Sequence, residues 1–229
     1  MSQHISKNGY RSAIRQRFLA VDSSNVMDAL DSIGCPNQAL HADFGPIVST
    51  GGKIAGFAYT IRGQMTPYEG TGDPEKMRAC NGISQDEVSV WSGDGRGICY
   101  FGELIALGMK ERGCTGAVVD GGVRDVRWIA MHEFPVFARY RTPVQSIGRW
   151  RVTAHQVPVY MCGATSDFVI VNPGDFLFGD EDGLVVIPVG CMEEVLSKAE
   201  ELTQKEARIR ADIAKGLSLA DALTKYGHV

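Results

Sequence analysis

Two kinds of hydrophobic pattern follow one another through the middle third of the chain. In some short segments apolar and polar residues alternate. Between these lie segments whose apolar residues recur every three or four positions, and glycines separate the segments. The predicted elements are, in order, a strand over 87–93, a helix over 102–113, a strand over 116–122, a helix over 124–133 and a strand over 135–140. Strands that alternate with helices indicate βαβ units and a largely parallel sheet.

The flanking segments show other patterns. On the N-terminal side we predict a helix over 24–33 and a strand over 53–62, and then a loop with a short helix over 63–82 that borders a site. In the second half, β segments follow one another with turn residues between them, which predicts an antiparallel layer. These segments lie at 149–156, 157–165, 167–176 and 183–188.

The C-terminal part predicts amphipathic helices. Apolar residues fall at helical spacing among Glu and Lys over 191–215, and a shorter helix over 219–225 follows Ser218 as its N-cap. The longer helix either packs on the rest of the chain or forms a subunit contact. We expect one α/β domain over 1–229, with a β-rich second half and 190–229 as a helical extension.

Composition and charge narrow the classes of protein to consider. Apolar residues make up 44% and charged residues 22%, which is ordinary for a globular protein and argues against disorder. A formal net charge of −4 provides no basic field that would attract phosphates, so nucleic acid is not an expected partner. No apolar run is long enough to span a bilayer, and the polar start of the sequence lacks a signal-peptide core. We expect a soluble cytoplasmic protein that binds no membrane.

The cysteines and histidines show no pattern of a metal site. No two cysteines form a C-x-x-C pair, so we expect buried or incidental thiols. The histidines share no metal-ligand spacing and are expected to be structural or solvent-facing, with His155 as the one candidate for a site. Phosphate-binding loops, dinucleotide fingerprints, zinc-protease helices and serine elbows are also missing from the sequence.

One apolar strand ends in residues that suit ligand binding. After this strand comes the segment DGGVRD at 120–125. It contains two glycines, followed by the cation Arg124 beside the anion Asp125. In open α/β sheets ligands collect at the carboxyl ends of strands, and glycines there let a ligand approach the backbone. The alternative is a carboxylate at the N-terminal end of a helix beside a surface arginine.

An acid stands at the start of the preceding helix. Gly102 and Glu103 open this helix, and two successive parallel strands bring the starts of their helices to one edge of the sheet. The backbone N–H groups of Leu104 and Ile105 would then face the same crevice as Arg124 and could bind a substrate carboxylate. Alternatively, Glu103 is an ordinary acid in the first turn of a helix.

Taken together, Glu103, 20 intervening residues and the pair Arg124-Asp125 resemble the acid-x20-Arg-Asp signature of the class II pyruvate aldolases. Within them the chain is similar to the 4-hydroxy-4-methyl-2-oxoglutarate / 4-carboxy-4-hydroxy-2-oxoadipate aldolases, which share their fold with the RraA regulators of ribonuclease activity. The resemblance covers most of the chain, including SNVMDALDSIG, KIAGFAYTIR, GELIALGMKERGCTGAVVDGGVRDV, FPVFAR and NPGDFLFGDEDGLVVIP.

The resemblance implies an αββα-type layered fold and a homotrimer or homohexamer with active sites between subunits. It implies a lyase that cleaves 4-hydroxy-2-oxo di- or tricarboxylic acids to pyruvate, with oxaloacetate decarboxylation as a side activity. By the same resemblance, Asp125 binds Mg²⁺ or Mn²⁺, and Arg124 binds the substrate and stabilises its enolate. Glu103 holds or deprotonates a metal-bound water. The start of the helix binds the pyruvyl carboxylate, through Gly102, Leu104 and Ile105.

Two positions depart from the family pattern. Members most like these aldolases carry Asp where Glu103 stands, and one extra methylene shifts a base by about 1 Å, enough to change rate or preference. Some relatives have an acid three residues after the Asp, where this chain has Trp128. A carboxylate from a neighbouring subunit is a candidate to complete the site, and the acidic terminal helix could provide it from Glu193, Glu194, Glu200 or Glu201.

A second interpretation is a non-catalytic RraA-like protein that binds a ribonuclease or helicase partner. The acid Glu103 together with Arg124 and Asp125 favours the enzyme, because a binding module has no need of such a triad. A third interpretation, a menaquinone-pathway methyltransferase, gains no support, since no glycine-rich nucleotide loop is present.

Overall fold

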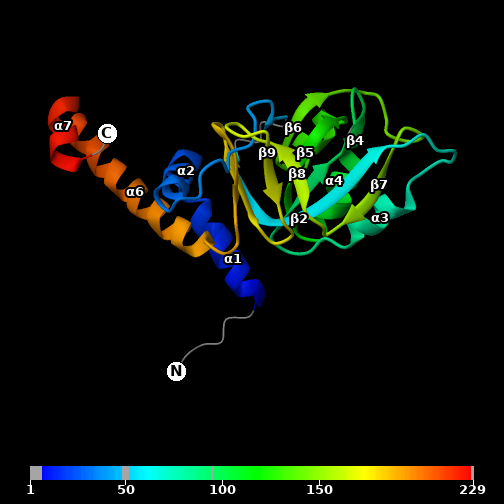
Figure 1. Ribbon diagram of the computed structural model, residues 1–229, viewed down its shortest axis with the longest axis horizontal. Coiled ribbons are helices and arrows are strands. Elements are labelled where there is room, and N and C mark those ends of the chain that lie inside the picture. Colours follow the sequence, from blue (N-terminus) through cyan, green and yellow to red (C-terminus); the bar gives the residue numbers. More distant parts are fainter. Residues whose placement is uncertain (1–6, 48–51, 94, 228–229) are drawn as a thin grey trace.

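The structure is a computed structural model that describes residues 7–47, 52–93 and 95–227, and its centre is a mixed β-sheet (Figure 1). Nine strands of the described chain belong to this sheet. Seven run side by side in the order β1 (Gly45–Pro46), β6 (Val136–Arg141), β5 (Cys114–Val123), β3 (Glu87–Ser92), β2 (Ile54–Met65), β10 (Phe176–Asp180) and β11 (Gly183–Ile187). The other two pair at the side, β4 (Cys99–Phe101) with β5 and β7 (Trp150–His155) with β2.

The centre of the sheet is parallel. β2 pairs in parallel with β3, β3 with β5, and β5 with both β4 and β6. Two helices, α4 (Glu103–Lys110) and α5 (Val126–Met131), connect β4 to β5 and β5 to β6. The predicted βαβ arrangement is therefore confirmed, and α4 and α5 lie in contact with each other.

The second half of the chain forms antiparallel pairs, but these do not make up one layer. β10 pairs with β2 and β11, and β7 pairs with β2, all antiparallel. With 12 residues, β2 is long enough for β10 to pair with 54–57 and β7 with 61–65. β8 (Val159–Cys162) and β9 (Phe168–Val171) form a separate two-stranded sheet. The antiparallel pairing was predicted correctly, whereas the length of β2 draws three of the strands into the main sheet.

Helices from both ends of the chain cover one end of the sheet. α1 (Lys7–Phe18), α2 (Ser23–Ser32) and the first part of α6 (Met192–Ile213) share an apolar core with β2, β10 and β11. Figure 1 shows the rest of α6 projecting away from this core to α7 (Leu219–Tyr226). The predicted cap of α7 is confirmed, since the Ser218 hydroxyl accepts the Asp221 N–H at 3.1 Å.

The hydrophobic pattern does not predict α1. Its anchors are Ile14 and Phe18, one helical turn apart, and most of its other residues are polar. The Phe18 ring stacks on Phe176 of β10 with 4.3 Å between the ring centroids. Two apolar side chains in 12 residues are too few for a periodic signal, and packing on the sheet stabilises the helix instead.

At the opposite end of the sheet, α3 (Pro74–Asn81) supplies the short helix expected within 63–82. Its cap is Asp73, whose Oδ1 accepts the N–H groups of Glu75 and Lys76 at 3.1 and 3.2 Å. The other oxygen accepts the Val152 N–H of β7 at 2.7 Å, so one buried carboxylate fixes α3 to the sheet. None of the helices in the described segments combines the length and the apolar character needed to cross a bilayer.

Candidate active site

The starts of α4 and α5 meet at one edge of the sheet, as the sequence predicts. β4 and β5 are parallel neighbours, and the Arg124 N–H donates to the Phe101 carbonyl at 3.1 Å. Gly102 follows β4 directly, and Arg124 follows β5 directly. The residues around Glu103 and the pair Arg124-Asp125 are therefore brought together by strand pairing alone.

Gly102 is the position where the two segments approach most closely. A Cβ atom on this residue would lie 2.8 Å from Asp125 Oδ2 and 3.3 Å from Arg124 Cγ, which is too close for an ordinary contact. The next amide, Glu103 N–H, points to the same Asp125 oxygen at 3.4 Å. A side chain at this position would displace the Asp125 carboxylate from its place beside the turn.

Asp125 is the N-cap residue of α5, but its carboxylate does not cap the helix. Its backbone is left-handed, with φ of 59°, and its carboxylate makes no capping hydrogen bond to the helix that it precedes. The side chain is 41% exposed and lies 3.3 Å from Arg124 Nε. A left-handed non-glycine residue is uncommon and is often found at functional sites. The turn directs the carboxylate toward the cleft instead of the helix end.

The first turn of α4 offers backbone donors. Within the described part of the chain, the N–H groups of Leu104 and Ile105 have no hydrogen-bond acceptor, and the first helical bond runs from Ala106 N–H to the Gly102 carbonyl. Such N–H groups, together with the positive end of the helix dipole, favour an anion. Leu104 and Ile105 line the same cleft as Arg124 and Asp125.

This cleft has a volume of about 860 Å³ and lies between the β4–β5 edge, α3 and the segment before β7. Its lining residues from α3 and the preceding loop are Tyr68, Thr71, Gly72, Asp73, Pro74, Lys76 and Met77. The loop expected to border a site therefore borders this cleft. Gln145, Ser146 and Ile147 contribute from the segment before β7, which the sequence pattern does not single out.

The carboxylate of Glu103 points to α5. Its Oε1 lies 2.9 Å from His132 Nε2, and the two side chains are only 19% and 29% exposed. The His132 carbonyl in turn accepts a hydrogen bond from Lys110 at the end of α4. No sequence pattern distinguishes His132 from the other histidines, because the contact depends on how α4 packs on α5.

His155, the histidine considered as a site candidate, lies elsewhere. Its Nδ1 is 3.2 Å from the Tyr59 hydroxyl, and its Nε2 is 4.0 Å from a Glu75 oxygen. Burial raises the pKa of Tyr59 to about 12, so this hydroxyl stays protonated at neutral pH. These contacts connect β7 to β2 and α3.

Comparison with known proteins adds the family. The family model RraA-like (Aldolase/RraA) matches residues 23–186, which is most of the chain. This chain belongs to the RraA-like family. The matched residues include both halves of the cleft, from Asp73 and Lys76 to Arg124 and Asp125.

Several known proteins are similar over large parts of the chain. Protein DlpA of Legionella pneumophila is 31% identical over 212 residues, which cover 92% of this chain but only 33% of DlpA. A 4-hydroxy-4-methyl-2-oxoglutarate aldolase of Thermus thermophilus is 32% identical over 142 residues, which cover 61% of this chain and 80% of that protein. Streptomyces coelicolor RraAS2, described as an unusual member of the RNase ES inhibitor RraA family, superposes with a TM-score of 0.70 and 25% identity, covering 86% of this chain and 96% of that chain.

The donor set of this RraA-like cleft suits one kind of cation. Within the described residues, no three His, Cys, Asp or Glu side chains gather as they do in a closed metal site. The exposed carboxylate of Asp125 faces a wide cleft. Mg²⁺ and Mn²⁺ fit such a place, because hard cations bind carboxylate oxygen and Mg²⁺ keeps several water ligands. A structural zinc site would need four protein ligands, which the described residues do not gather at this cleft.

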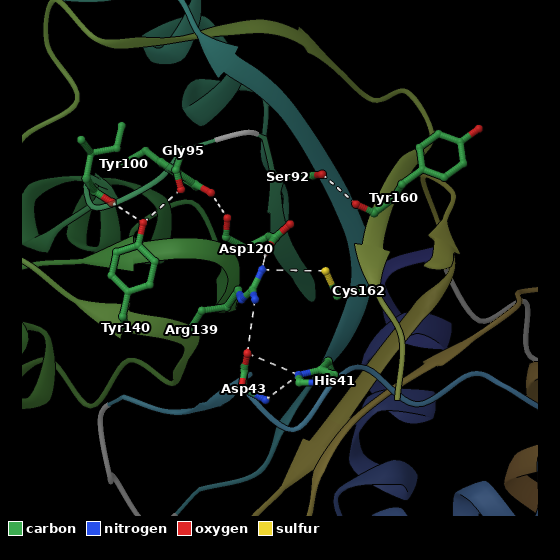
Figure 2. Close-up of polar contacts among 11 residues, drawn as sticks. His41, Asp43, Ser92, Gly95, Tyr100, Asp120, Arg139, Tyr140, Tyr160 and Cys162 are labelled. Carbon is green, nitrogen blue, oxygen red and sulfur yellow. Dashed lines mark hydrogen bonds and ion pairs between the residues drawn. The ribbon is translucent and has the colours of Figure 1, made fainter. Parts of the chain in front are cut away.

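A second polar cluster lies away from the cleft and includes Asp120, the first residue of the DGGVRD segment (Figure 2). Arg139 donates to Asp120 Oδ1 and Asp43 Oδ2, each at 3.2 Å. The neighbouring glycines make room for the protein itself: a side chain at Gly121 would overlap the Tyr100 ring, and one at Gly122 would overlap the Ile98 carbonyl. We expected these glycines to admit a ligand, but close packing of β4 on β5 accounts for them.

Proposed function

We propose that this RraA-like protein is a lyase that cleaves 4-hydroxy-2-oxo di- or tricarboxylic acids to pyruvate. The observation that carries the proposal is that Arg124, Asp125 and the start of α4 line one cleft. The backbone N–H groups of Leu104 and Ile105 there donate to no acceptor among the described residues. Cations and oriented amides suit a substrate carboxylate, and an exposed carboxylate suits a divalent metal. The named aldolase of Thermus thermophilus supports the same reaction class.

The substrate carboxylate next to the keto group would bind at the start of α4. The N–H groups of Leu104 and Ile105 would donate to its oxygens, and the Arg124 guanidinium would approach from the strand edge. Gly102 would leave the backbone accessible beside them. The keto group would then lie next to Asp125, because the Cβ position of Gly102 is 2.8 Å from Asp125 Oδ2.

Asp125 would hold Mg²⁺ or Mn²⁺, which when bound supplies a Lewis acid for the keto oxygen. The protein's own contribution is the Arg124 guanidinium, which lies beside Asp125 at 3.3 Å, is 43% exposed and would meet the developing charge. As the bond between C3 and C4 breaks, its electron pair moves into the pyruvate enolate, and a cation positioned there lowers the barrier.

Glu103 would remove the proton from the 4-hydroxyl group of the substrate. This proton must leave as the C4 carbonyl forms, and a proton returns to C3 when the enolate becomes pyruvate. Glu103 does not line the cleft, and its carboxylate meets His132, so it would act on the substrate through a water molecule. Oxaloacetate decarboxylation passes through the same enolate with CO₂ as the leaving group, and it needs no base at C4. We propose it as a side activity.

Exposed apolar side chains beside the cleft support a homotrimer or homohexamer with sites between subunits. Leu104, Trp128 and Met131 on α4 and α5 are 78%, 54% and 63% exposed. In α6, Glu193 accepts from Tyr10, and Glu200 pairs with Arg17 at 2.7 Å. The exposed Glu194 and Glu201 are therefore the better candidates to provide a carboxylate to a neighbouring subunit.

A non-catalytic regulator that binds a ribonuclease or helicase is the second candidate function, and the similarity to RraAS2 favours it. Pyruvate release from hydroxy-oxo acids, followed with a lactate dehydrogenase couple, discriminates the two. Asp125→Ala and Arg124→Ala should each reduce release to background while the protein stays folded. The exposed neighbours Glu111→Gln and Arg112→Ala, at the far end of α4, serve as controls and should retain activity. Retention of most activity in either cleft variant would remove the site assignment.

A further inference from the structure

Lys76 of α3 lines the same cleft as Arg124 and Asp125. Its Nζ lies 5.6 Å from the centroid of the Trp91 ring and 5.9 Å from that of Trp150. Both rings are fully buried. Cation–π attraction reaches to about 6 Å, so these contacts stabilise the ammonium group only weakly.

The acids near Lys76 are occupied elsewhere. Asp73 accepts three backbone N–H groups and has both oxygens in use. Glu75 pairs with Arg78 at 2.5 Å. Among the described residues, none of the ion pairs within 4.0 Å involves the Lys76 ammonium. Within that part of the chain, Lys76 is therefore a cation without a protein counter-ion.

A buried, unpaired ammonium group is costly. Lys76 is partly buried where it lines the cleft, and this burial lowers the pKa of Lys76, with the charge of Arg124 acting in the same direction and the charge of Asp73 opposing it. Burial raises the pKa of the Cys99 thiol, whereas the charges of Arg124 and Lys76 oppose that rise. Both cations thus act on one side chain that lines the cleft, from two different elements, β5–α5 and α3.

We propose that Lys76 binds the carboxylate at the far end of the substrate, remote from the pyruvyl half, and so selects oxo acids that carry a second carboxylate. Arg124 and the start of α4 take the carboxylate next to the keto group, and Lys76 supplies the matching charge on the other wall of the cleft. This inference rests on the proposed function of the cleft. In the aldol cleavage Lys76 is a specificity residue, since the carboxylate that it binds keeps its own bonds while the bond between C3 and C4 breaks.

Two substrates that differ in the far carboxylate test the inference. 4-hydroxy-4-methyl-2-oxoglutarate carries it, and 4-hydroxy-2-oxopentanoate lacks it. Loss of a hydrogen bond to a charged group corresponds to about a 10- to 100-fold change. Lys76→Met should therefore lower kcat/KM for the dicarboxylate by about 10- to 100-fold and leave the monocarboxylate within about twofold, whereas Lys76→Arg should retain part of the activity. Equal losses on both substrates would overturn the inference. Lys215→Met, exposed after α6, is the control and should behave as wild type.

A binding measurement separates the failure of this inference from failure of the proposed function. Titration calorimetry with 2-oxoglutarate and 2-oxobutanoate needs no turnover. Lys76→Met should weaken binding of 2-oxoglutarate by about 10- to 100-fold and leave 2-oxobutanoate unchanged. If no acid yields pyruvate but this difference is found, the lyase proposal fails and the role of Lys76 stands. Equal affinities of variant and wild type for 2-oxoglutarate would overturn the role of Lys76.

A trapping experiment with borohydride tests whether the Lys76 amine acts as a nucleophile instead. A neutral lysine amine can attack a keto carbon, lose water and form an imine, which borohydride reduces to a stable secondary amine. Treatment of the protein with pyruvate and borohydride should leave the mass of the peptide that contains Lys76 unchanged. Added mass on Lys76 would show that it acts as a nucleophile and would contradict the binding role.

Discussion

The carboxylate of Glu103 and the imidazole of His132 meet at 2.9 Å, on two neighbouring helices that frame the candidate active site. If Glu103 is the base, His132 is its positioning residue. His132→Ala should lower kcat about 10-fold and leave KM nearly unchanged, because the substrate touches other groups. Steady-state kinetics across a pH range measures both. A variant that loses thermal stability but keeps the kcat and pH profile of the wild type would limit His132 to a structural role.

Glu103→Gln should separate the two reactions proposed for the site. Cleavage of a 4-hydroxy-2-oxo acid needs a base for the hydroxyl proton, and loss of a general base lowers rates by about 10²- to 10⁴-fold. Decarboxylation of oxaloacetate needs no such base, so its rate should change by only about threefold. Both rates can be measured on one protein preparation. Parallel losses in the two reactions would contradict the role of Glu103 as the base.

Gly102→Ala should inactivate the protein through Asp125. The added Cβ would lie 2.8 Å from Asp125 Oδ2, so the carboxylate or the β4–α4 turn must move. We expect at least about a 100-fold loss of pyruvate release, since misplacement by about 1 Å has effects of this size. Gly108→Ala is a matched control in the same helix, where the new Cβ meets open space. It should retain activity and gain about 0.5–1 kcal/mol in the free energy of unfolding. Normal activity of Gly102→Ala would show that the close approach is unimportant.

The pH dependence of stability tests the burial of Lys76. Burial lowers the pKa of Lys76 in the folded state, whereas the unfolded chain keeps the ordinary value. Between these two pKa values the unfolded state binds more protons, so stability rises with pH in this window. Below the lowered pKa the full cost of the buried charge remains.

Lys76→Met removes this contribution. The Tm of the variant should be higher than that of the wild type, and the difference should be largest at a pH below the lowered pKa of Lys76. This difference in Tm should shrink as the pH approaches about 10. Differential scanning calorimetry without added oxo acids gives both values. A difference in Tm that is the same at about pH 6 and about pH 9.5 would mean that Lys76 carries no buried charge.

The parts of the site that could be predicted from the sequence depend on local order along the chain. Arg124 and Asp125 follow a strand directly, and Glu103 opens a helix in the preceding βαβ unit, so parallel pairing alone brings them together. The hydrophobic periods predict β5 and the two helices, but not β4, whose three residues are too few to show a period. The same reasoning could not give the left-handed backbone of Asp125, which decides where its carboxylate points.

Contacts between distant elements could not be predicted in this way. His132 reaches Glu103 because α5 packs on α4, and Lys76 reaches the cleft because Asp73 fixes α3 to β7. Neither contact leaves a periodic signal. For a related reason, the sequence pattern does not predict α1. Its two buried apolar residues, Ile14 and Phe18, stabilise the helix only by packing on the sheet.

Pyruvate release from 4-hydroxy-4-methyl-2-oxoglutarate, measured with added Mg²⁺ and with excess EDTA, tests most directly whether this cleft is a metal-dependent lyase site. The lactate dehydrogenase couple should report steady pyruvate formation with Mg²⁺ and almost none with EDTA, and renewed addition of Mg²⁺ or Mn²⁺ should restore it. Asp125→Ala should stay inactive at every metal concentration. Equal pyruvate release with EDTA and with Mg²⁺, or no release from any 4-hydroxy-2-oxo acid, would contradict the proposed function.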